Sequence, residues 1–397
     1  MDRRDFLKKS TFASGMMLIP SFLKGMEFIK PESISGFKNV IIIQLSGGND
    51  GLNTIIPHRN DSYHNLRPTI SKSLNETLKL TDDLGINKAC LGLKELFDNG
   101  EMTIINNVGY PNPNRSHFRS RDIWHSGSDS SEYLKTGWAG RYLDSYCQGA
   151  YQAIEHDSSL SLILKGKKTK GIAVTNPKQL FQATRETYFK NIVKNTDQDL
   201  LNEDNQGYLY KTLLETYSSA DYIYERSKIY ASQTDYPGNS FGKSLKGISD
   251  MINSGLNTRV YYSTLGGFDT HVNQNATQDQ LLKIYSESIS ALVKDLKKTG
   301  KFKDTLILTF SEFGRRAKEN GSRGTDHGTA NNLFIIGSQL KQPGVLGNAP
   351  DLSNLDNNGD LIYDIDFRSI YATVLNRWLD ADDTIVLGKN FQKLNFI

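Results

Sequence analysis

The run Val40-Ile41-Ile42-Ile43-Gln44-Leu45, followed by Ser46-Gly47-Gly48-Asn49-Asp50-Gly51, decides the fold. A short β-branched run with little polar alternation is typical of a strand that is buried on both faces, and a polar, glycine-rich turn ends it. Four further runs of this kind follow, at residues 102–108, 259–264, 305–310 and 333–336. Strands of this type are found mainly in sheets that are largely parallel.

Helical patterns fill the intervals between these strands, so we expect a crossover for each strand. The resulting prediction is an α/β fold, a largely parallel sheet with helices on both faces. Residues 157–205 are less regular, with strands expected near 160–164 and 172–174, and are interpreted as an excursion or cap. Residues 343–360 are interpreted as a surface loop. The helices are expected at 89–98, 117–124, 138–146, 206–231, 242–254, 279–299 and 367–379.

The chain begins Asp2-Arg3-Arg4-Asp5-Phe6-Leu7-Lys8-Lys9-Ser10 and continues into an apolar run at 12–23, which together indicate a twin-arginine export signal over residues 1–25. We therefore expect a periplasmic protein whose residues 26–397 form a single domain. The apolar run contains Pro20 and is shorter than the roughly 18 to 20 residues that span a bilayer. No clear cleavage site follows, so retention of this segment as an uncleaved anchor stays open, and contact with the membrane is expected only in that case.

Charge and cysteine content exclude several classes of protein. The formal net charge of the 397 residues is +3, and residues 1–25 carry all of it, which leaves the remainder near neutral. A neutral chain without basic runs gives no electrostatic case for binding nucleic acid. The two cysteines, Cys90 and Cys147, could pair in an oxidising compartment. Each lies in a predicted helix among apolar neighbours, which favours two buried small side chains over a disulfide.

Polar residues gather directly beside the predicted strands, where ligands bind in open α/β sheets. Asp269 and His271 follow the third strand, and a carboxylate and an imidazole two residues apart suit zinc, manganese or iron. Asp in such a turn is also a common helix cap, so both interpretations stay open. Glu312 follows an apolar strand, where a carboxylate needs a metal ion or a paired arginine such as Arg315. His327 precedes the last strand in a glycine-rich loop, which favours a ligand.

Ser116 has the position of a helix N-cap after the second strand, and capping is its plain interpretation. A hydroxyl at a helix N-terminus, between Arg115 and His117, is also where a nucleophile or a bound anion would be placed. The turn at 47–51 lacks the Gly-Lys-Ser/Thr that closes a phosphate-binding P-loop. Asp50 is therefore interpreted as a metal ligand or a turn former.

Four segments together carry a resemblance to a known family. They resemble, in the same order, a bacterial family of proteins exported by the twin-arginine pathway and catalogued as a domain of unknown function, DUF1501. The resemblance covers essentially the whole mature chain. It implies a fold similar to alkaline phosphatases, sulfatases and cofactor-independent phosphoglycerate mutases. The segments are Leu45-Ser46-Gly47-Gly48-Asn49-Asp50-Gly51-Leu52-Asn53, Val108-Gly109-Tyr110-Pro111-Asn112-Pro113-Asn114-Arg115-Ser116-His117-Phe118, Phe268-Asp269-Thr270-His271 and Ser311-Glu312-Phe313-Gly314-Arg315.

The resemblance also implies roles for individual residues. Ser116 falls on the position of the nucleophile, and Phe313 stands where that superfamily usually has a metal-binding histidine, so one ligand of a two-metal site is missing. The cofactor implied is one or two divalent ions, zinc or manganese. The ligands expected from the residues and the resemblance together are Asp50, Asp269, His271, Glu312 and His327.

The sequence thus predicts an exported, metal-dependent hydrolase of phosphate or sulfate esters, with a small anionic ester as substrate. Arg115, Arg119 or Arg315 would neutralise the non-bridging oxygens of that substrate. The alternative is a non-catalytic cell-envelope protein that keeps this fold and works as a binding or assembly partner. The pair Glu312-Phe313 is the feature that favours the alternative.

Overall fold

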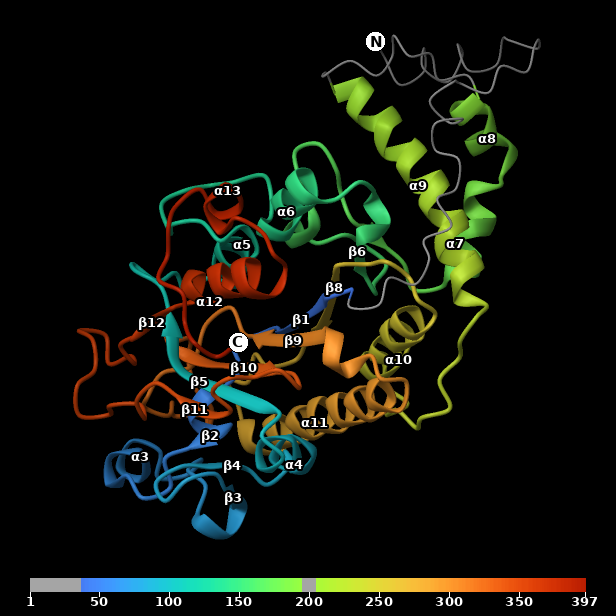
Figure 1. The fold of residues 1–397 in the computed structure, drawn as a ribbon. Helices are drawn as coiled ribbons and strands as arrows, with labels where there is room; N and C mark the ends of the chain where they lie inside the picture. The colour runs from blue at the N-terminus through green and yellow to red at the C-terminus, as the bar shows by residue number, and fades with distance from the viewer. Residues whose placement is uncertain (1–36, 195–204) are drawn as a thin grey trace.

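The computed structural model describes residues 37–194 and 205–397, and the predicted export signal lies outside these residues. A nine-stranded sheet runs through the centre of the molecule (Figure 1) in the order β11-β5-β10-β9-β1-β8-β6-β7, with β12 beside β5. The strands are β1 (Asn39–Leu45), β5 (Met102–Gly109), β6 (Ala153–Glu155), β7 (Ile172–Ala173), β8 (Val260–Leu265), β9 (Thr305–Phe310), β10 (Asn331–Ile336), β11 (Gly344–Leu346) and β12 (Ile365–Asp366).

Most neighbouring strands of the large sheet pair in parallel. β1 lies between β8 and β9 and is parallel to both, and β6, β7, β11 and β12 also pair in parallel. β10 alone among the nine strands is antiparallel to its neighbours, β5 and β9. The predicted fold class is confirmed, but the expected crossover before the last strand is wrong. Residues 311–330 return the chain as a loop without a helix, and a buried apolar run does not reveal its own direction.

The two faces of the sheet carry separate hydrophobic cores. Ile41, Ile43 and Leu45 of β1 point into one core, and Val40 and Ile42 point into the other, as the alternation of a strand requires. Burial of each such side chain contributes about 1.5 to 3 kcal/mol. The first core is covered by α4 (Leu91–Asp98), α10 (Ser240–Asn253) and α11 (Gln274–Lys298), and the second by α5 (His117–Ser126), α6 (Trp138–Tyr146), α12 (Phe367–Thr373) and α13 (Asp383–Leu387).

The remaining elements lie around this central unit. A small antiparallel sheet consists of β2 (Ile55–Ile56), β4 (Gly85–Asn87) and β3 (Thr77–Lys79), next to α3 (Asp61–Leu66). Figure 1 shows α7 (Pro177–Thr184), α8 (Thr187–Lys194) and α9 (Asn205–Ser227) projecting from the main body. The strand expected at 160–164 is instead a 3₁₀ turn at Leu162–Leu164, whereas β7 is confirmed. The interpretation of 26–397 as one domain with an excursion stays a prediction.

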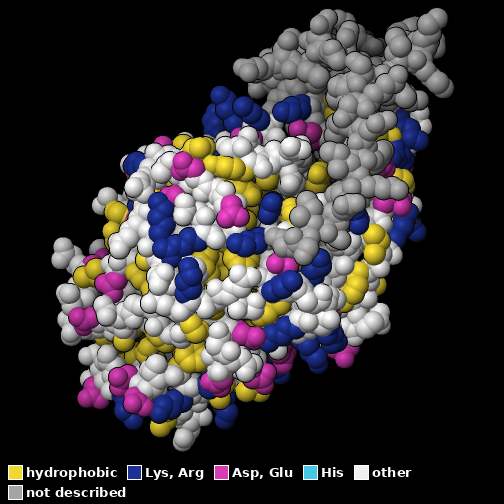
Figure 2. Space-filling view, in the orientation of Figure 1, with side chains coloured by type: hydrophobic (Ala, Val, Ile, Leu, Met, Phe, Trp, Pro, Cys, Tyr) yellow, Lys and Arg dark blue, Asp and Glu magenta, His cyan; other side chains and the backbone are white. Residues whose placement is uncertain are grey.

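The surface and the cysteines add two observations. On the face in Figure 2, lysine and arginine side chains are interspersed with aspartate and glutamate, as the near-neutral charge of residues 26–397 leads one to expect. Cys90 is buried, Cys147 is half-buried, and both are free thiols. Among the described residues, none of the helices combines the length and the apolar character that a membrane crossing requires.

Candidate metal centre

Strand direction brings the polar segments to one edge of the sheet. β1, β5, β8 and β9 run the same way, so the residues that follow them emerge at a common edge. β10 runs the opposite way, so the residues that precede it emerge there as well. His327, four residues before β10, can therefore meet Asp269 and His271, which follow β8. Because β10 is antiparallel to β9, His327 lies at the same edge of the sheet as Asp269 and His271.

Asp269 is the hub of the resulting cluster. Its Oδ1 lies 2.9 Å from Nε2 of His271, 3.1 Å from Nε2 of His327 and 2.6 Å from Nη2 of Arg315. Its Oδ2 lies 3.4 Å from Nε2 of His117. The Nε2 atoms of His271 and His327 are 3.0 Å apart. One carboxylate thus faces three imidazole nitrogens and one guanidinium.

Each of the three imidazoles is held at its other nitrogen by a hydrogen-bond acceptor. Nδ1 of His117 is 3.0 Å from Oε1 of Glu312, and Nδ1 of His271 is 3.2 Å from Oδ1 of Asp326. Nδ1 of His327 is 2.8 Å from the backbone oxygen of Arg115. Because these acceptors require a proton on Nδ1, the neutral tautomer of each ring leaves a lone pair on Nε2. Histidines that bind metal ions are oriented in this way.

The donor set fits a cation. Around a tetrahedral zinc ion with bonds of about 2.1 Å, ligand atoms are roughly 3.4 Å apart. Oδ1 of Asp269 lies 2.9 and 3.1 Å from His271 and His327, and Oδ2 lies 3.4 Å from His117, which are separations close to this value. His117, Asp269 and His327 form the most compact group, with ligand atoms within 4.8 Å of one another, and His271 lies beside it. Nε2 of His117 is buried and makes no hydrogen bond, although it lies 3.4 Å from Oδ2 of Asp269. A metal ion between these atoms would satisfy that lone pair.

The electrostatic environment of the cluster keeps Asp269 ionised. Partial burial alone would raise the pKa of Asp269, but the hydrogen bond and charge of the Arg315 guanidinium, together with the neighbouring His327 and His271, lower it to about 2. Burial lowers the pKa of His327, whereas the hydrogen bond to Glu312 raises the pKa of His117. Asp269 is therefore a carboxylate, and His327 a neutral imidazole, over the pH range in which metal ions bind.

Phe313 points into this site. Its ring is 98% buried and packs against the rings of His117 and His327, with centroids 4.9 and 4.7 Å apart. Gly48, with φ of +75°, permits this approach, because a Cβ there would lie 2.4 Å from the Phe313 ring. An aromatic ring supplies no lone pair to a metal ion, so this side of the cluster offers no further ligand.

The structure does not bring Asp50 into the cluster. Its carboxylate is fully buried and accepts hydrogen bonds from Nη1 of Arg67 at 2.7 Å, from Nε2 of Gln274 at 2.5 Å and from the backbone of Leu52. Arg67 is fully buried as well, and its other donors bind backbone oxygens and Asn53. The ligand role of Asp50 stays a prediction, and the geometry gives it the partners of a structural ion pair.

Glu312 lies behind His117 rather than between the imidazoles. It is 99% buried and accepts hydrogen bonds at Oε1 from His117 and from the backbone of Gly47, and at Oε2 from Gln44. These partners satisfy a buried carboxylate without a metal ion. Its ligand role also stays a prediction, and its contacts suit a residue that orients His117.

The three arginines predicted to bind substrate oxygens all have protein partners. Arg315 is fully buried and donates to Asp269 and to backbone oxygens of the surrounding loops. Arg119 donates to the backbone of residues 129–132 and lies over the ring of Tyr133. Arg115 pairs with Asp360. None of the three points a free guanidinium at the cluster.

Ser116 lies between two residues that contact the cluster. The backbone oxygen of Arg115 binds His327, and the His117 side chain faces Asp269. Ser116 is the N-cap residue of α5 by backbone geometry, but its exposed side chain makes no capping hydrogen bond. Its hydroxyl is therefore available at the positive end of the helix.

Sequence reasoning missed His117 as a member of the cluster. The only available signal was its position, directly after Ser116 in a polar segment that follows a strand. The contact that orients it joins residues 195 positions apart. A spacing pattern such as Asp-x-His cannot show an association of this kind.

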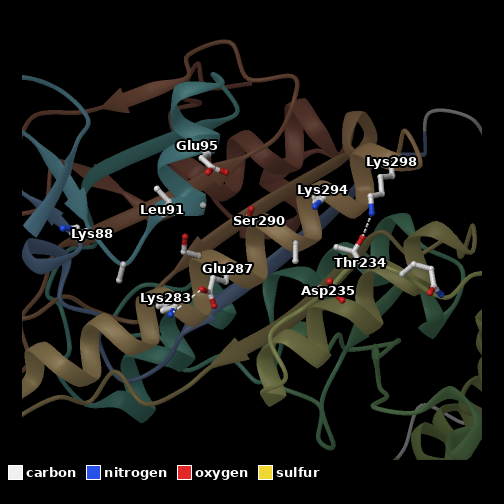
Figure 3. Close-up of a pocket in the computed structure, with 15 residues that line it drawn as sticks. Lys88, Leu91, Glu95, Thr234, Asp235, Lys283, Glu287, Ser290, Lys294 and Lys298 are labelled. Carbon is white, nitrogen blue, oxygen red and sulfur yellow. Dashed lines mark hydrogen bonds and ion pairs between the residues drawn. The ribbon is translucent and has the colours of Figure 1, made fainter.

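A large hollow elsewhere on the surface is distinct from the cluster. Figure 3 shows it beside α4 and α11, with Lys88, Glu95, Lys283, Glu287 and Lys294 around it. It measures about 780 Å³ and is widely open. Its lining mixes both signs of charge and contains none of the histidines of the metal centre, so no reaction is assigned to it.

The fold and the site define an α/β protein with a candidate metal centre of three histidines and one aspartate at the carboxyl edge of its sheet. The chain belongs to the DUF1501 family, described as proteins of unknown function, whose model matches residues 37–379. This confirms the family indicated by the sequence motifs. No curated protein matches the chain.

Three solved structures illustrate the overall likeness. A sulfatase, PsFucS1 from Pseudoalteromonas sp., is 13% identical, with 100% of this chain and 75% of that chain covered and a TM-score of 0.38. The C-terminal periplasmic domain of EcEptC from Escherichia coli, in complex with Zn, is 10% identical, with coverage of 78% and 75% and a TM-score of 0.38. A protein in the alkaline phosphatase superfamily from Vibrio parahaemolyticus is 10% identical, with coverage of 79% and 63% and a TM-score of 0.35. At these identities and TM-scores the likenesses indicate no function for the chain.

Proposed function

We propose that this protein is a metal-dependent hydrolase of phosphate or sulfate esters that holds one divalent ion at the metal centre. The observation that carries the proposal is the shared orientation of His117, His271 and His327. All three bind an acceptor through Nδ1 and direct Nε2 toward Asp269. The Arg315 guanidinium already lies against Oδ1 of Asp269 and Nε2 of His271, and a bound cation would offset the repulsion among the remaining lone pairs.

The donors favour zinc over manganese. Three imidazole nitrogens and one carboxylate oxygen suit zinc, whereas manganese is better matched by sites dominated by carboxylate and water oxygens. Arg315 already neutralises much of the charge on Asp269, which further reduces the attraction for a hard cation. A bound ion of this kind would supply Lewis-acid polarisation of an ester oxygen and would lower the pKa of a nearby hydroxyl.

The chain itself would supply the nucleophile and its positioning. Ser116 is exposed, is free of a capping hydrogen bond and heads α5. The helix N-terminus stabilises negative charge on the attacking oxygen and on the bound ester. Glu312 would hold the ring of His117, and Asp326 the ring of His271, so that the ligand geometry is set before substrate binds.

One observation favours the second candidate, a non-catalytic binding or assembly protein of the cell envelope. Hydrolases of anionic esters use free cationic groups beside the reacting centre. Arg115, Arg119 and Arg315 are instead bound to protein acceptors. In this second candidate the same metal centre would stabilise a surface that a partner protein binds.

Metal analysis and hydrolysis assays separate the two candidates. Protein exported and folded in a bacterial host should contain about one zinc ion per chain. It should hydrolyse an aryl phosphate, an aryl phosphodiester or an aryl sulfate, and this activity should be lost in Ser116→Ala but kept in Ser240→Ala, an exposed serine at the start of α10. Bound metal without hydrolysis of any of the three would support the binding protein. Absence of metal from the exported protein would refute both forms of the proposal.

Export is a separate part of the proposal. The paired arginines at positions 3 and 4 motivate a periplasmic location. Replacement of both by lysine should leave the protein in the cytoplasm, as cell fractionation would show. Periplasmic accumulation of that variant would refute the twin-arginine route.

A further inference from the structure

We infer that Asp360 is a positioning residue of the metal centre, which acts through Arg115 on His327. The inference rests on the proposed metal centre. Asp360 lies in the loop before β12, and no motif in the sequence connects it with the histidines. Its side chain makes no contact with the cluster itself. Arg115 links Asp360 to the cluster, because it contacts both Asp360 and His327.

Asp360 is a buried carboxylate held by two arginines. Its side chain is fully buried, and each of its oxygens is taken by a different guanidinium, Oδ2 by Arg115 and Oδ1 by Arg316 at 3.3 Å. Its backbone N–H donates to Asp356, which closes the turn around it. Arg316 also donates to the backbone of Asn358. The charge of Asp360 is thus fully compensated, and its position is fixed on all sides.

Arg115 connects this carboxylate to the cluster. Its guanidinium binds Asp360, while its backbone oxygen accepts the Nδ1 hydrogen bond of His327 at 2.8 Å. That hydrogen bond sets the tautomer and the ring direction of His327. The two ends of one residue therefore join the loop before β12 to a metal-binding ring.

The segment that carries Arg115 has few other anchors. It runs from Tyr110 to Ser116 between β5 and α5 as an irregular loop with two prolines. The Tyr110 hydroxyl accepts from the backbone of Asn114, whose side chain in turn accepts from the backbone of Ser116. Tyr110 is also anchored outside the loop, through its hydroxyl to Ser120 of α5 and through its ring to Phe367, whereas the contacts of Asn114 and Ser116 are local to the loop. The ion pair with Asp360 ties the Arg115 side chain to a distant, buried part of the chain, and the half-buried Asp356 of the same turn adds a longer contact of 3.8 Å.

Loss of the Asp360 charge should therefore loosen the metal centre without removing a ligand. In Asp360→Asn, the zinc dissociation constant should rise about tenfold, the lower end of the range for groups behind a ligand. The absorption bands of the cobalt-substituted protein should shift, because the ring of His327 turns. The matched control is Asp383→Asn, a buried carboxylate of α13 that pairs with Lys393 and has no contact with the cluster. That control should lose stability but keep zinc affinity and cobalt spectrum.

Arg115→Lys keeps the backbone oxygen and the charge but shortens the reach to Asp360, so it should weaken zinc binding in the same direction. If Asp360→Asn does not fold, the zinc affinity of Arg115→Lys tests the positioning role of Asp360 in its place. The inference is overturned if the folded variants bind zinc as tightly as the wild type and give the same cobalt spectrum. A wild-type protein that binds no zinc would refute the metal centre itself, which is a different result.

Discussion

Asp50 gives the sharpest test of the geometry, because the sequence indicates a metal ligand and the structure places it in an ion pair. We take the substitution Asp50→Asn, which keeps the shape of the side chain and the acceptor for Leu52. The wild-type carboxylate and Arg67 are both fully buried and lie 2.7 Å apart. In the variant, the guanidinium of Arg67 keeps its charge without a counter-ion in the interior.

The expected cost follows from that burial. Removal of one partner from a buried ion pair destabilises a protein by about 3 to 5 kcal/mol. This is a large part of the roughly 5 to 15 kcal/mol by which a domain is stable. Zinc affinity should stay close to that of the wild type, since Asp50 binds Arg67, Gln274 and Leu52 rather than the imidazoles.

The assay compares this variant with a second single variant, His327→Ala. Urea denaturation of both apo proteins gives the free energy of unfolding, and calorimetric titration gives the zinc affinity. Asp50→Asn should lose stability and keep zinc, whereas His327→Ala should lose zinc with a smaller loss of stability, because its side chain is 22% exposed. Tight zinc binding that disappears in Asp50→Asn at unchanged unfolding free energy would show that Asp50 is a ligand and that our reasoning is wrong.

Three further predictions follow from the same contacts. Ser116→Ala should abolish hydrolysis yet change the unfolding free energy by less than about 0.5 kcal/mol, since its hydroxyl makes no capping bond; retained activity would exclude Ser116 as nucleophile. Zinc titration should give one tight site per chain, because Phe313 packs against the rings of His117 and His327 and supplies no lone pair for a second ion; two sites of equal affinity would contradict this. Burial raises the pKa of Glu155 from 4.5 to about 7, so the folded protein retains a proton that the unfolded chain releases. Stability should therefore fall as pH rises through this window, and Glu155→Gln should gain about 3 kcal/mol relative to the wild type between pH 4.5 and 8 in urea titrations; an equal difference at both pH values would refute this.

The strands were predictable from the sequence because burial on both faces leaves a plain signal. Val40 to Leu45 is apolar at nearly every position, since alternate residues enter two different cores. The direction of β10 left no such signal, because an antiparallel strand buried on both faces has the same composition as a parallel one. Its direction is nevertheless what carries His327 to the edge where β8 delivers Asp269.

The candidate site could be predicted only in part. Asp269, His271 and His327 stood out because they flank strands, and the structure brings them together. The role of a carboxylate depends on partners that spacing does not reveal. Asp50 meets Arg67, seventeen positions further along the chain, and Glu312 meets His117, 195 positions before it.

Arg315 shows why the sequence could not separate a substrate-binding arginine from a structural one. Both roles need a guanidinium near the ends of the strands, and they differ only in burial. Arg315 is buried because the turn at Gly47 and Gly48 approaches closely, and the missing side chains leave backbone oxygens within its reach. It also binds backbone oxygens of Phe268 and Thr325. One side chain thus joins the turn after β1 to the loops that carry Asp269, His271 and His327, so the charge expected to meet a substrate holds the candidate metal centre together.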